Sequence, residues 1–193
     1  MSLYSIAPFI REHYPQYYSI ESYPAGECAP IRKTSQEWGI LSNFAKTTLE
    51  VGGVIFNSAE RLFQTMKFQD EETVRAVFSA ANPKFTAKKF EKTRRRPDWG
   101  EIIVDAMKFC LQTKYEQSLI FRSKLEESKG KFIVEDQSSF PKKTADTWGV
   151  KLAGDNYSGP NLLGRLLMEL RDGGRLVYNM PTDALDFLRF LIL

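Results

Sequence analysis

The chain has 193 residues, of which 42% are hydrophobic, and a formal net charge of +3. This length and composition predict one domain with a sizeable core. The apolar runs are too short to span a bilayer, and residues 1–14 lack the basic start and apolar middle of a signal peptide. We therefore expect a cytoplasmic protein that is not inserted in a membrane.

Cysteine and histidine are scarce. Cys28 and Cys110 are the only cysteines and lie far apart in the sequence, which argues against a disulfide framework and against a thiolate metal site. Cys110 is expected in the core. The single histidine, His13, argues against a Ser-His-Asp triad and a histidine-rich metal centre. Acid and base chemistry would fall to Glu, Asp, Lys or Tyr.

The elements expected in the first third of the chain are mostly irregular or extended. Residues 1–30 mix tyrosines with prolines and show little periodicity, so we predict an irregular segment that can hold one short helix. Residues 29–34 and 49–56 are rich in branched and apolar side chains, which predicts strands of a small sheet. Gly52 and Gly53 mark a turn or bulge inside the second of these ranges.

Helices are expected to dominate the rest of the chain. Ser58 is the predicted N-cap of a helix that ends at Phe68. A polar, turn-prone stretch at 142–156 precedes a last helix at 161–171, which Gly173 and Gly174 would end. The fold class is therefore α+β, a predominantly helical single domain with a small sheet. The other predicted elements are helices at 70–79, 87–93, 99–118 and 122–128 and a short strand at 132–135.

The basic residues are concentrated between the helices predicted at 70–79 and 99–118. Residues 84–96 contain seven Lys or Arg and one Glu, a net charge of +6, which leaves −3 for the rest of the chain. A concentrated basic segment attracts phosphates. A solvated helix face is the alternative, and the sequence leaves both open.

Lys114 stands out on the helix predicted at 99–118. Ile103, Met107 and Cys110 trace its buried stripe, and a further step of four residues reaches Lys114. An ammonium group there must be desolvated, paired or directed into a pocket, and desolvation lowers a lysine pKa and makes the amine a better nucleophile. The structural alternative is an ion pair, with Glu60 or Glu135 as candidate partners, or a side chain that reaches solvent.

A series of short motifs runs in order from about residue 31 to residue 171. Taken together they resemble the NADAR family, named for NAD and ADP-ribose association and also called YbiA-like. The resemblance implies an α+β domain at 31–172 that hydrolyses N-glycosidic bonds, with an N-terminal extension at 1–30 and a C-terminal extension at 173–193. The motifs are Glu37-Trp-Gly-Ile-Leu-Ser-Asn-Phe44, Ser58-Ala-Glu-Arg-Leu-Phe-Gln-Thr-Met-Lys-Phe68, Asn82-Pro83, Ala87-Lys88-Lys89, Arg96-Pro-Asp-Trp99, Met107, Lys114-Tyr115, Ile133-Val-Glu135, Trp148-Gly149 and Asn161 to Arg171.

The resemblance implies three catalytic residues. The family's Ser-Ala-Glu or Thr-Val-Glu motif carries a functional glutamate onto Glu60, and its Lys-Tyr or Lys-Phe position matches Lys114. Many members have an acid three residues before the Trp-Gly pair, where this chain has Ala145. Assigning that role to Asp146 requires a small shift in register, and Asp146 could otherwise be a turn aspartate. We assign Glu60 to the ribose or the attacking water, Lys114 to covalent or electrostatic catalysis, and Asp146 to proton transfer.

Nine further residues are expected to bind substrate. The two tryptophans could stack on a planar base or belong to the core. The asparagines could read ribose hydroxyls or amide edges, and the glycines would let the backbone approach a ligand. The nine residues are Asn43, Phe44, Lys67, Arg96, Trp99, Trp148, Gly149, Asn161 and Gly164.

Three functional hypotheses follow. The first is a hydrolase that removes ADP-ribose from ADP-ribosylated guanine in nucleic acid or a nucleoside, which suits the basic segment. The second is an N-glycosidase of phosphorylated riboflavin-pathway intermediates, the ribosylamino-pyrimidines, for which a smaller anionic pocket would suffice. The third is a non-catalytic ADP-ribose-binding module. Hydrolysis of this kind requires no metal and no cofactor, so we expect neither.

Overall fold

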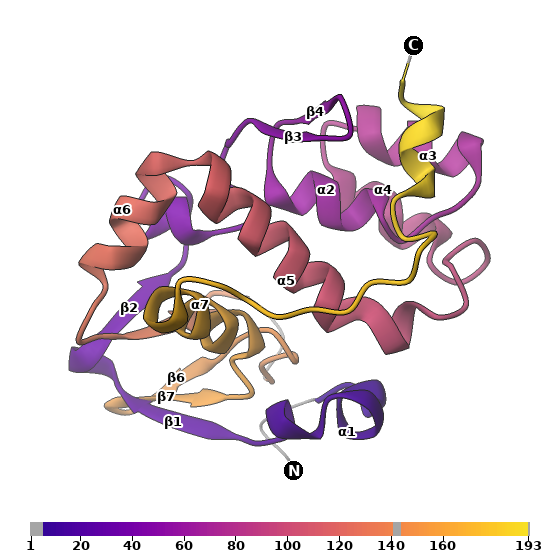
Figure 1. Ribbon diagram of the computed structural model, residues 1–193. Coiled ribbons are helices and arrows are strands. Elements are labelled where there is room, and N and C mark those ends of the chain that lie inside the picture. Colours follow the sequence, from indigo (N-terminus) through magenta and orange to yellow (C-terminus); the bar gives the residue numbers. More distant parts are fainter. Residues whose placement is uncertain (1–5, 141–143, 193) are drawn as a thin grey trace. The chain divides into compact units, whose positions relative to one another are not determined.

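The computed structural model describes residues 6–140 and 144–192, and its elements are drawn in Figure 1. The chain forms two compact units: unit 1 consists of Met1–Ser42 and Ile120–Leu176, and unit 2 of Asn43–Leu119 and Val177–Leu193. The fold is α+β, predominantly helical with small sheets, as predicted. Within the described ranges, no helix combines the length and the hydropathy that crossing a bilayer requires.

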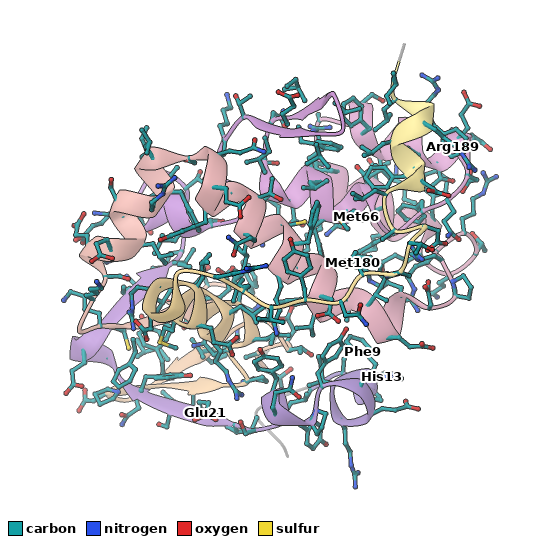
Figure 2. The ribbon with its side chains drawn as sticks, viewed as in Figure 1. Phe9, His13, Glu21, Met66, Met180 and Arg189 are labelled. Carbon is teal, nitrogen blue, oxygen red and sulfur yellow. The ribbon has the colours of Figure 1, made fainter. Side chains whose placement is uncertain are left out.

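Unit 1 contains two small sheets. An antiparallel sheet has the order β1-β7-β6, and a separate parallel pair joins β2 to β5. Its helical segments include α1, whose residues Phe9 and His13 are labelled in Figure 2. The elements are α1 (Pro8–His13), η1 (Pro15–Tyr17), β1 (Glu21–Pro24), η2 (Ala25–Glu27), β2 (Cys28–Ile31), η3 (Gly39–Leu41), α6 (Leu119–Glu127), β5 (Phe132–Glu135), β6 (Lys151–Ala153), β7 (Asn156–Gly159) and α7 (Leu162–Gly173).

The interior of unit 1 lies between its strands and α7. α7 packs against β5, because Leu163, Leu166 and Leu170 form a buried stripe on the helix. A second cluster joins the strands and consists of Tyr23, Cys28, Val134, Val150 and Tyr157. α7 ends at Gly173 and is capped by Gly174, whose φ of 68° is the left-handed conformation that glycine adopts without strain. The predicted end of this helix is therefore confirmed.

Unit 2 is a group of helices with one hairpin. Gly52 and Gly53 have φ values of 55° and 79°, which a two-residue hairpin turn of type I′ requires. α2 packs against α3, α4 and α5. The elements are β3 (Leu49–Val51), β4 (Val54–Phe56), α2 (Ala59–Thr65), α3 (Glu71–Ser79), α4 (Pro83–Phe90), α5 (Trp99–Gln117) and η4 (Asp186–Phe190).

Capping side chains start three helices of unit 2. Ser58, Asp70 and Asn82 each accept a hydrogen bond from the backbone N–H three residues further on, at 3.1, 3.0 and 3.0 Å. The predicted cap at Ser58 is confirmed. The prediction that α4 starts at residue 87 is wrong, because Asn82 caps the helix and Pro83 suits its first turn.

The strand prediction was incomplete. β1 lies inside the segment 1–30 that we expected to be irregular, and β6 lies inside the polar stretch 142–156. Both strands pair with β7, and Glu21 of β1 lies opposite Gly159. Such short strands depend on a distant partner and leave no local periodicity. Residues 142 and 143 of the polar stretch fall outside the described ranges. β2 ends at Ile31, so it is shorter than predicted.

Candidate active site

Glu60 lies in the first turn of α2, two residues after the Ser58 cap. Its backbone N–H donates to the Asn43 carbonyl oxygen at 2.9 Å, and only 5% of the residue is exposed. The Gln64 Nε2 atom donates to the Glu60 Oε1 atom at 2.7 Å. Gln64 is one helical turn further on, where side chains four residues apart meet. The carboxyl group is therefore held in a buried and defined position.

The surroundings of Glu60 act on its pKa in opposite directions. Burial raises the pKa of the Glu60 carboxyl, because a carboxylate loses hydration inside a protein. The charge of Lys84, the Gln64 hydrogen bond and the charge of Lys67 lower it, and the net shift is upward. A carboxyl group whose pKa is raised holds a proton more readily than a free one, which is typical of groups that exchange protons in catalysis.

Lys67 is another buried charged residue of unit 2. Only 7% of the residue is exposed, and its ammonium group forms an ion pair with Glu91. The Nζ atom lies 5.7 Å from the ring centroid of Phe63 and 5.9 Å from that of Trp99, which are cation–π distances. Burial lowers the pKa of Lys67, while Glu91 and Glu60 raise it. These neighbours fix the ammonium group close enough to Glu60 for their charges to interact.

Trp99 and Arg96 are both buried. Trp99 is 1% exposed, and its ring centroid lies 5.3 Å from that of Phe63. This burial favours the core interpretation of Trp99. The Arg96 guanidinium donates to Asp98 at 2.6 and 2.9 Å and to Asp183 at 2.9 Å. Two carboxylates therefore already balance the charge of Arg96.

The basic segment 84–96 divides into two groups. Arg94 pairs with Asp70 at 3.2 Å and with Glu72 at 2.6 Å, so it joins Arg96 among the arginines bound to the protein's own carboxylates. Arg94 is itself exposed, and the other exposed members are Lys84, Lys88, Lys89, Lys92 and Arg95. Arg94 and Arg96 are thus held in ion pairs, and phosphate binding by the other exposed members stays a prediction, as does the solvated face.

Asn43 contacts Glu60, and its neighbour Phe44 contacts Lys84 of the basic segment. Asn43 is 3% exposed, and its Nδ2 atom donates to the Met107 Sδ atom at 3.0 Å. Phe44 is 46% exposed, and the Lys84 Nζ atom lies 5.4 Å from its ring centroid. Since Lys84 also acts on the pKa of Glu60, an exposed aromatic ring and a cation accompany the buried carboxyl group.

Lys114 lies on the buried side of α5, as the helical spacing predicts. The residue is 0% exposed, and burial lowers the pKa of its amine from 10.5 to about 7. A substantial fraction of the amine is therefore neutral, and hence nucleophilic, near neutral pH.

Cys110 lies one turn before Lys114 and is confirmed as a core residue, with 0% exposure. Its Sγ atom lies 3.7 Å from the Sδ atom of Met66, which is labelled in Figure 2. Burial, with a contribution from the charge of Glu60, raises the pKa of the Cys110 thiol well above its usual value. The thiol therefore stays protonated and is a poor nucleophile.

Asp146 and Trp148 belong to a loop of unit 1. The Asp146 Oδ1 atom accepts from the Gln137 Nε2 atom at 2.6 Å and from the Trp148 backbone N–H at 2.9 Å. The Asp146 backbone N–H donates to the Gln137 Oε1 atom at 3.0 Å. These bonds shape the turn that carries the partly exposed Trp148. The role of Asp146 in proton transfer and that of Trp148 in stacking stay predictions.

Asn161, Gly149 and Gly164 lie in close contact with strand β5 of unit 1. The Asn161 side chain accepts from the Glu135 N–H at 3.1 Å and donates to the Ile133 carbonyl at 2.9 Å. A Cβ atom on Gly164 would lie 2.2 Å from the Ile133 carbonyl oxygen, and one on Gly149 would lie 2.5 Å from that of Glu135. The sequence suggested that the two glycines let the backbone approach a ligand. In the structure their backbone lies close to the carbonyl oxygens of strand β5. Binding of substrate by these three residues stays a prediction.

The family model for the NADAR domain matches residues 31–173 of the chain. The chain belongs to the NADAR family. The matched range includes parts of both unit 1 and unit 2.

Curated and solved relatives agree with this assignment. N-glycosidase YbiA of Shigella boydii serotype 4 (strain Sb227) is 31% identical over 142 residues, which cover 72% of this chain and 83% of the relative. Riboflavin biosynthesis protein VVA0006 of Vibrio vulnificus (strain YJ016) is 29% identical over 153 residues, or 78% of this chain and 39% of that protein. The NMR structure of the Escherichia coli protein YbiA matches with a TM-score of 0.61 and 28% identity, covering 76% of this chain and 83% of the other.

The NADAR domain distributes its candidate residues between the two units. Unit 2 holds Glu60 and Lys114 with the predicted binding residues up to Trp99, and unit 1 holds Asp146 and the binding residues from Trp148 onward. Sequence reasoning gave no role to Gln64, although its spacing of four from Glu60 could have indicated the hydrogen bond. Among the residues that the structure describes, no three His, Cys, Asp or Glu side chains gather as metal ligands would.

Proposed function

We propose that this NADAR protein is a hydrolase of N-glycosidic bonds and that Glu60 is its central catalytic residue. The supporting observation is a buried carboxyl group with a raised pKa, held by Gln64 and subject to the charges of Lys67 and Lys84. Ionisable groups with pKa values shifted by burial and by specific neighbours are typical of active sites. The relatives named N-glycosidase support the same reaction class.

The reaction defines what Glu60 has to do. The bond between the ribose anomeric carbon and the base nitrogen breaks, its electron pair leaves with the base, and the base takes up a proton. Water adds to the anomeric carbon and loses a proton. Positive charge develops on the ribose, so the ionised carboxylate of Glu60 stabilises the transition state or accepts the proton of the water.

Lys114 offers a second, covalent contribution. With a pKa of about 7, its neutral amine can add to the aldehyde form of the released sugar. Loss of one water molecule gives a Schiff base, and addition of water returns the free sugar and the free amine. The protonated amine provides an electrostatic alternative, in which its charge stabilises the departing base.

For the substrate, we propose ADP-ribosylated guanine in nucleic acid or a nucleoside. Exposed cations along residues 84–95 suit the diphosphate and any neighbouring phosphates. The exposed Phe44 ring beside Lys84 provides a face on which a base can stack. Phe44 is thus an exposed candidate for stacking, whereas Trp99 is 1% exposed.

Two observations favour a second candidate substrate, a phosphorylated ribosylamino-pyrimidine. One relative is named a riboflavin biosynthesis protein. Arg94 and Arg96 are also engaged with the protein's own carboxylates, which leaves fewer cations for a polynucleotide. A small monophosphate would need only one or two of the exposed lysines.

The test is release of free base, followed by mass spectrometry. The protein is incubated with an oligonucleotide carrying ADP-ribosylated guanine, with ADP-ribosylated guanosine and with a phosphorylated ribosylamino-pyrimidine. Glu60→Gln should lower turnover by roughly two to four orders of magnitude and leave substrate binding nearly intact. Glu71→Gln is the matched control, because Glu71 is an exposed acid in the first turn of α3.

The outcomes separate the hypotheses. Release from only one substrate class identifies that class. Near-normal turnover of Glu60→Gln removes Glu60 from the mechanism. Tight binding of ADP-ribose with no release from any substrate would favour the non-catalytic ADP-ribose-binding module.

A further inference from the structure

Two residues that are hydrogen-bonded to Glu60 carry a buried side-chain amide oxygen. Gln64 is 4% exposed and Asn43 is 3% exposed. Among the described residues, the Gln64 Oε1 atom and the Asn43 Oδ1 atom have no hydrogen-bond partner. A buried acceptor without a donor costs about 1–3 kcal/mol, so two of them on residues that are hydrogen-bonded to Glu60 need an explanation.

Hydrogen bonds define which way both amides point. The Gln64 Nε2 atom donates to Glu60 at 2.7 Å, so the Oε1 atom on the same carbon lies next to that carboxyl group. The Asn43 backbone carbonyl accepts from the Glu60 N–H at 2.9 Å, and its side-chain Nδ2 atom donates to Met107 at 3.0 Å. Each side chain thus uses its donor within the protein and keeps its acceptor.

We infer that Gln64, together with Asn43, reads the 2- and 3-hydroxyl groups of the ribose whose anomeric carbon faces Glu60. The inference rests on the proposed N-glycosidase function. Two neutral acceptors require a ligand with two neighbouring donors, and a vicinal diol provides them. The hydroxyl on the carbon next to the anomeric carbon is the sugar donor closest to a carboxylate acting on that carbon. Gln64 is therefore a specificity residue that also positions Glu60.

This arrangement predicts discrimination against deoxy sugars. A site built to bond a substrate hydroxyl leaves its own buried group unpaired when the hydroxyl is missing, so it rejects the analogue. One neutral hydrogen bond of this kind corresponds to a preference of about tenfold. The same preference should appear for any 5-phosphorylated ribose, whichever base is removed, because both candidate substrates release such a sugar.

The experiment compares the dissociation constants of ribose 5-phosphate and 2-deoxyribose 5-phosphate by calorimetry. We expect the parent protein to bind the ribose compound about tenfold more tightly. Gln64→Met removes the acceptor with little change in shape, and Asn43→Leu removes the other. At least one of them should bring the ratio close to one. Gln69→Met is the control, because Gln69 is exposed and its amide donates to Asp183.

A second measurement separates positioning from a general structural role. The Gln64 hydrogen bond lowers the pKa of Glu60, so Gln64→Met should move the acidic limb of the pH profile of kcat/KM to higher pH. Thermal melting of each variant shows whether it is folded.

Equal affinity of the parent protein for the two sugars would overturn the inference, and it would indicate that the acceptors face a base amine instead. A ratio that neither variant changes would overturn it as well. Sugar binding requires no turnover, so this result stands even where no base is released and the proposed N-glycosidase function fails.

Discussion

Lys114 gives the sharpest test of how burial acts in this protein. Its residue is 0% exposed, and burial lowers the pKa of its amine from 10.5 to about 7. The perturbation is Lys114→Met, which keeps an unbranched apolar side chain, one atom shorter, and removes the ionisable group. Between pH 7 and pH 10.5 the unfolded chain binds a proton at this position that the folded protein has released.

The sign and the size follow from that difference. The unfolded state binds more protons in this window, so the free energy of unfolding of the parent protein rises with pH across it. Each unit of pKa difference corresponds to about 1.4 kcal/mol, so the full effect of Lys114 is about 5 kcal/mol. This destabilisation is fully present below pH 7 and disappears above pH 10.5. Lys114→Met should remove it.

Urea unfolding followed by tryptophan fluorescence measures the effect at pH 6, 7, 8 and 9. The stability of Lys114→Met relative to the parent should be largest at pH 6 and should fall by about 2–3 kcal/mol between pH 7 and pH 9. Contacts of Lys114 that do not depend on its protonation change the stability difference by the same amount at every pH, so they leave its slope with pH unchanged. Lys88→Met, on the exposed face of α4, should show no such slope. A difference that is flat with pH would refute the argument and with it a neutral amine near pH 7.

The other predictions concern catalysis, phosphate binding and packing. If Lys114 forms a Schiff base, borohydride added during turnover should fix a sugar-sized mass on the peptide that contains it, and Lys114→Arg should prevent this adduct. Full activity of Lys114→Arg, without any adduct in the parent protein, would make Lys114 a structural residue. Lys88, Lys89 and Lys92 are three of the exposed lysines of the basic segment. Replacing all three by glutamine should weaken binding of an ADP-ribosylated oligonucleotide and flatten its salt dependence, and an unchanged slope would assign them to a solvated face. Gly164→Ala should lower stability by about 1–3 kcal/mol, because its Cβ would lie 2.2 Å from the Ile133 carbonyl oxygen. Gly173→Ala, with open space around it, should be nearly neutral in thermal melting, and equal effects at both glycines would contradict the packing argument.

Local signals in the sequence located most helices of the domain correctly. Ser58 is a cap because its hydroxyl accepts from a backbone N–H three residues away, and such a bond needs no other part of the chain. The buried stripe of α5 also follows from spacing, which is why the burial of Cys110 and Lys114 was predictable. The start of α4 was misplaced because the prediction did not use the capping signal that Asn82 and Pro83 carry.

Strand pairing was the main feature of the fold that local patterns did not reveal. β1 and β6 are short and partly exposed, and each is stabilised by hydrogen bonds to β7. Neither strand alternates strongly enough to be recognised alone. For β3 and β4, in contrast, the sequence indicated a turn or a bulge at Gly52 and Gly53, and the structure has the turn, which joins two strands adjacent in sequence.

For the candidate site, the sequence by itself determined which residue types are available and which of them share a helix face. It identified Glu60 through a family motif and Lys114 through helical spacing, and it showed that basic charge gathers at 84–96. Tertiary structure decided their environments. It buried Trp99 and exposed Phe44, joined Arg96 to Asp183, and left the Gln64 acceptor beside Glu60. The physical reason is that spacing and capping are interactions within a few residues, whereas desolvation and ion pairing depend on which distant segments pack against a side chain.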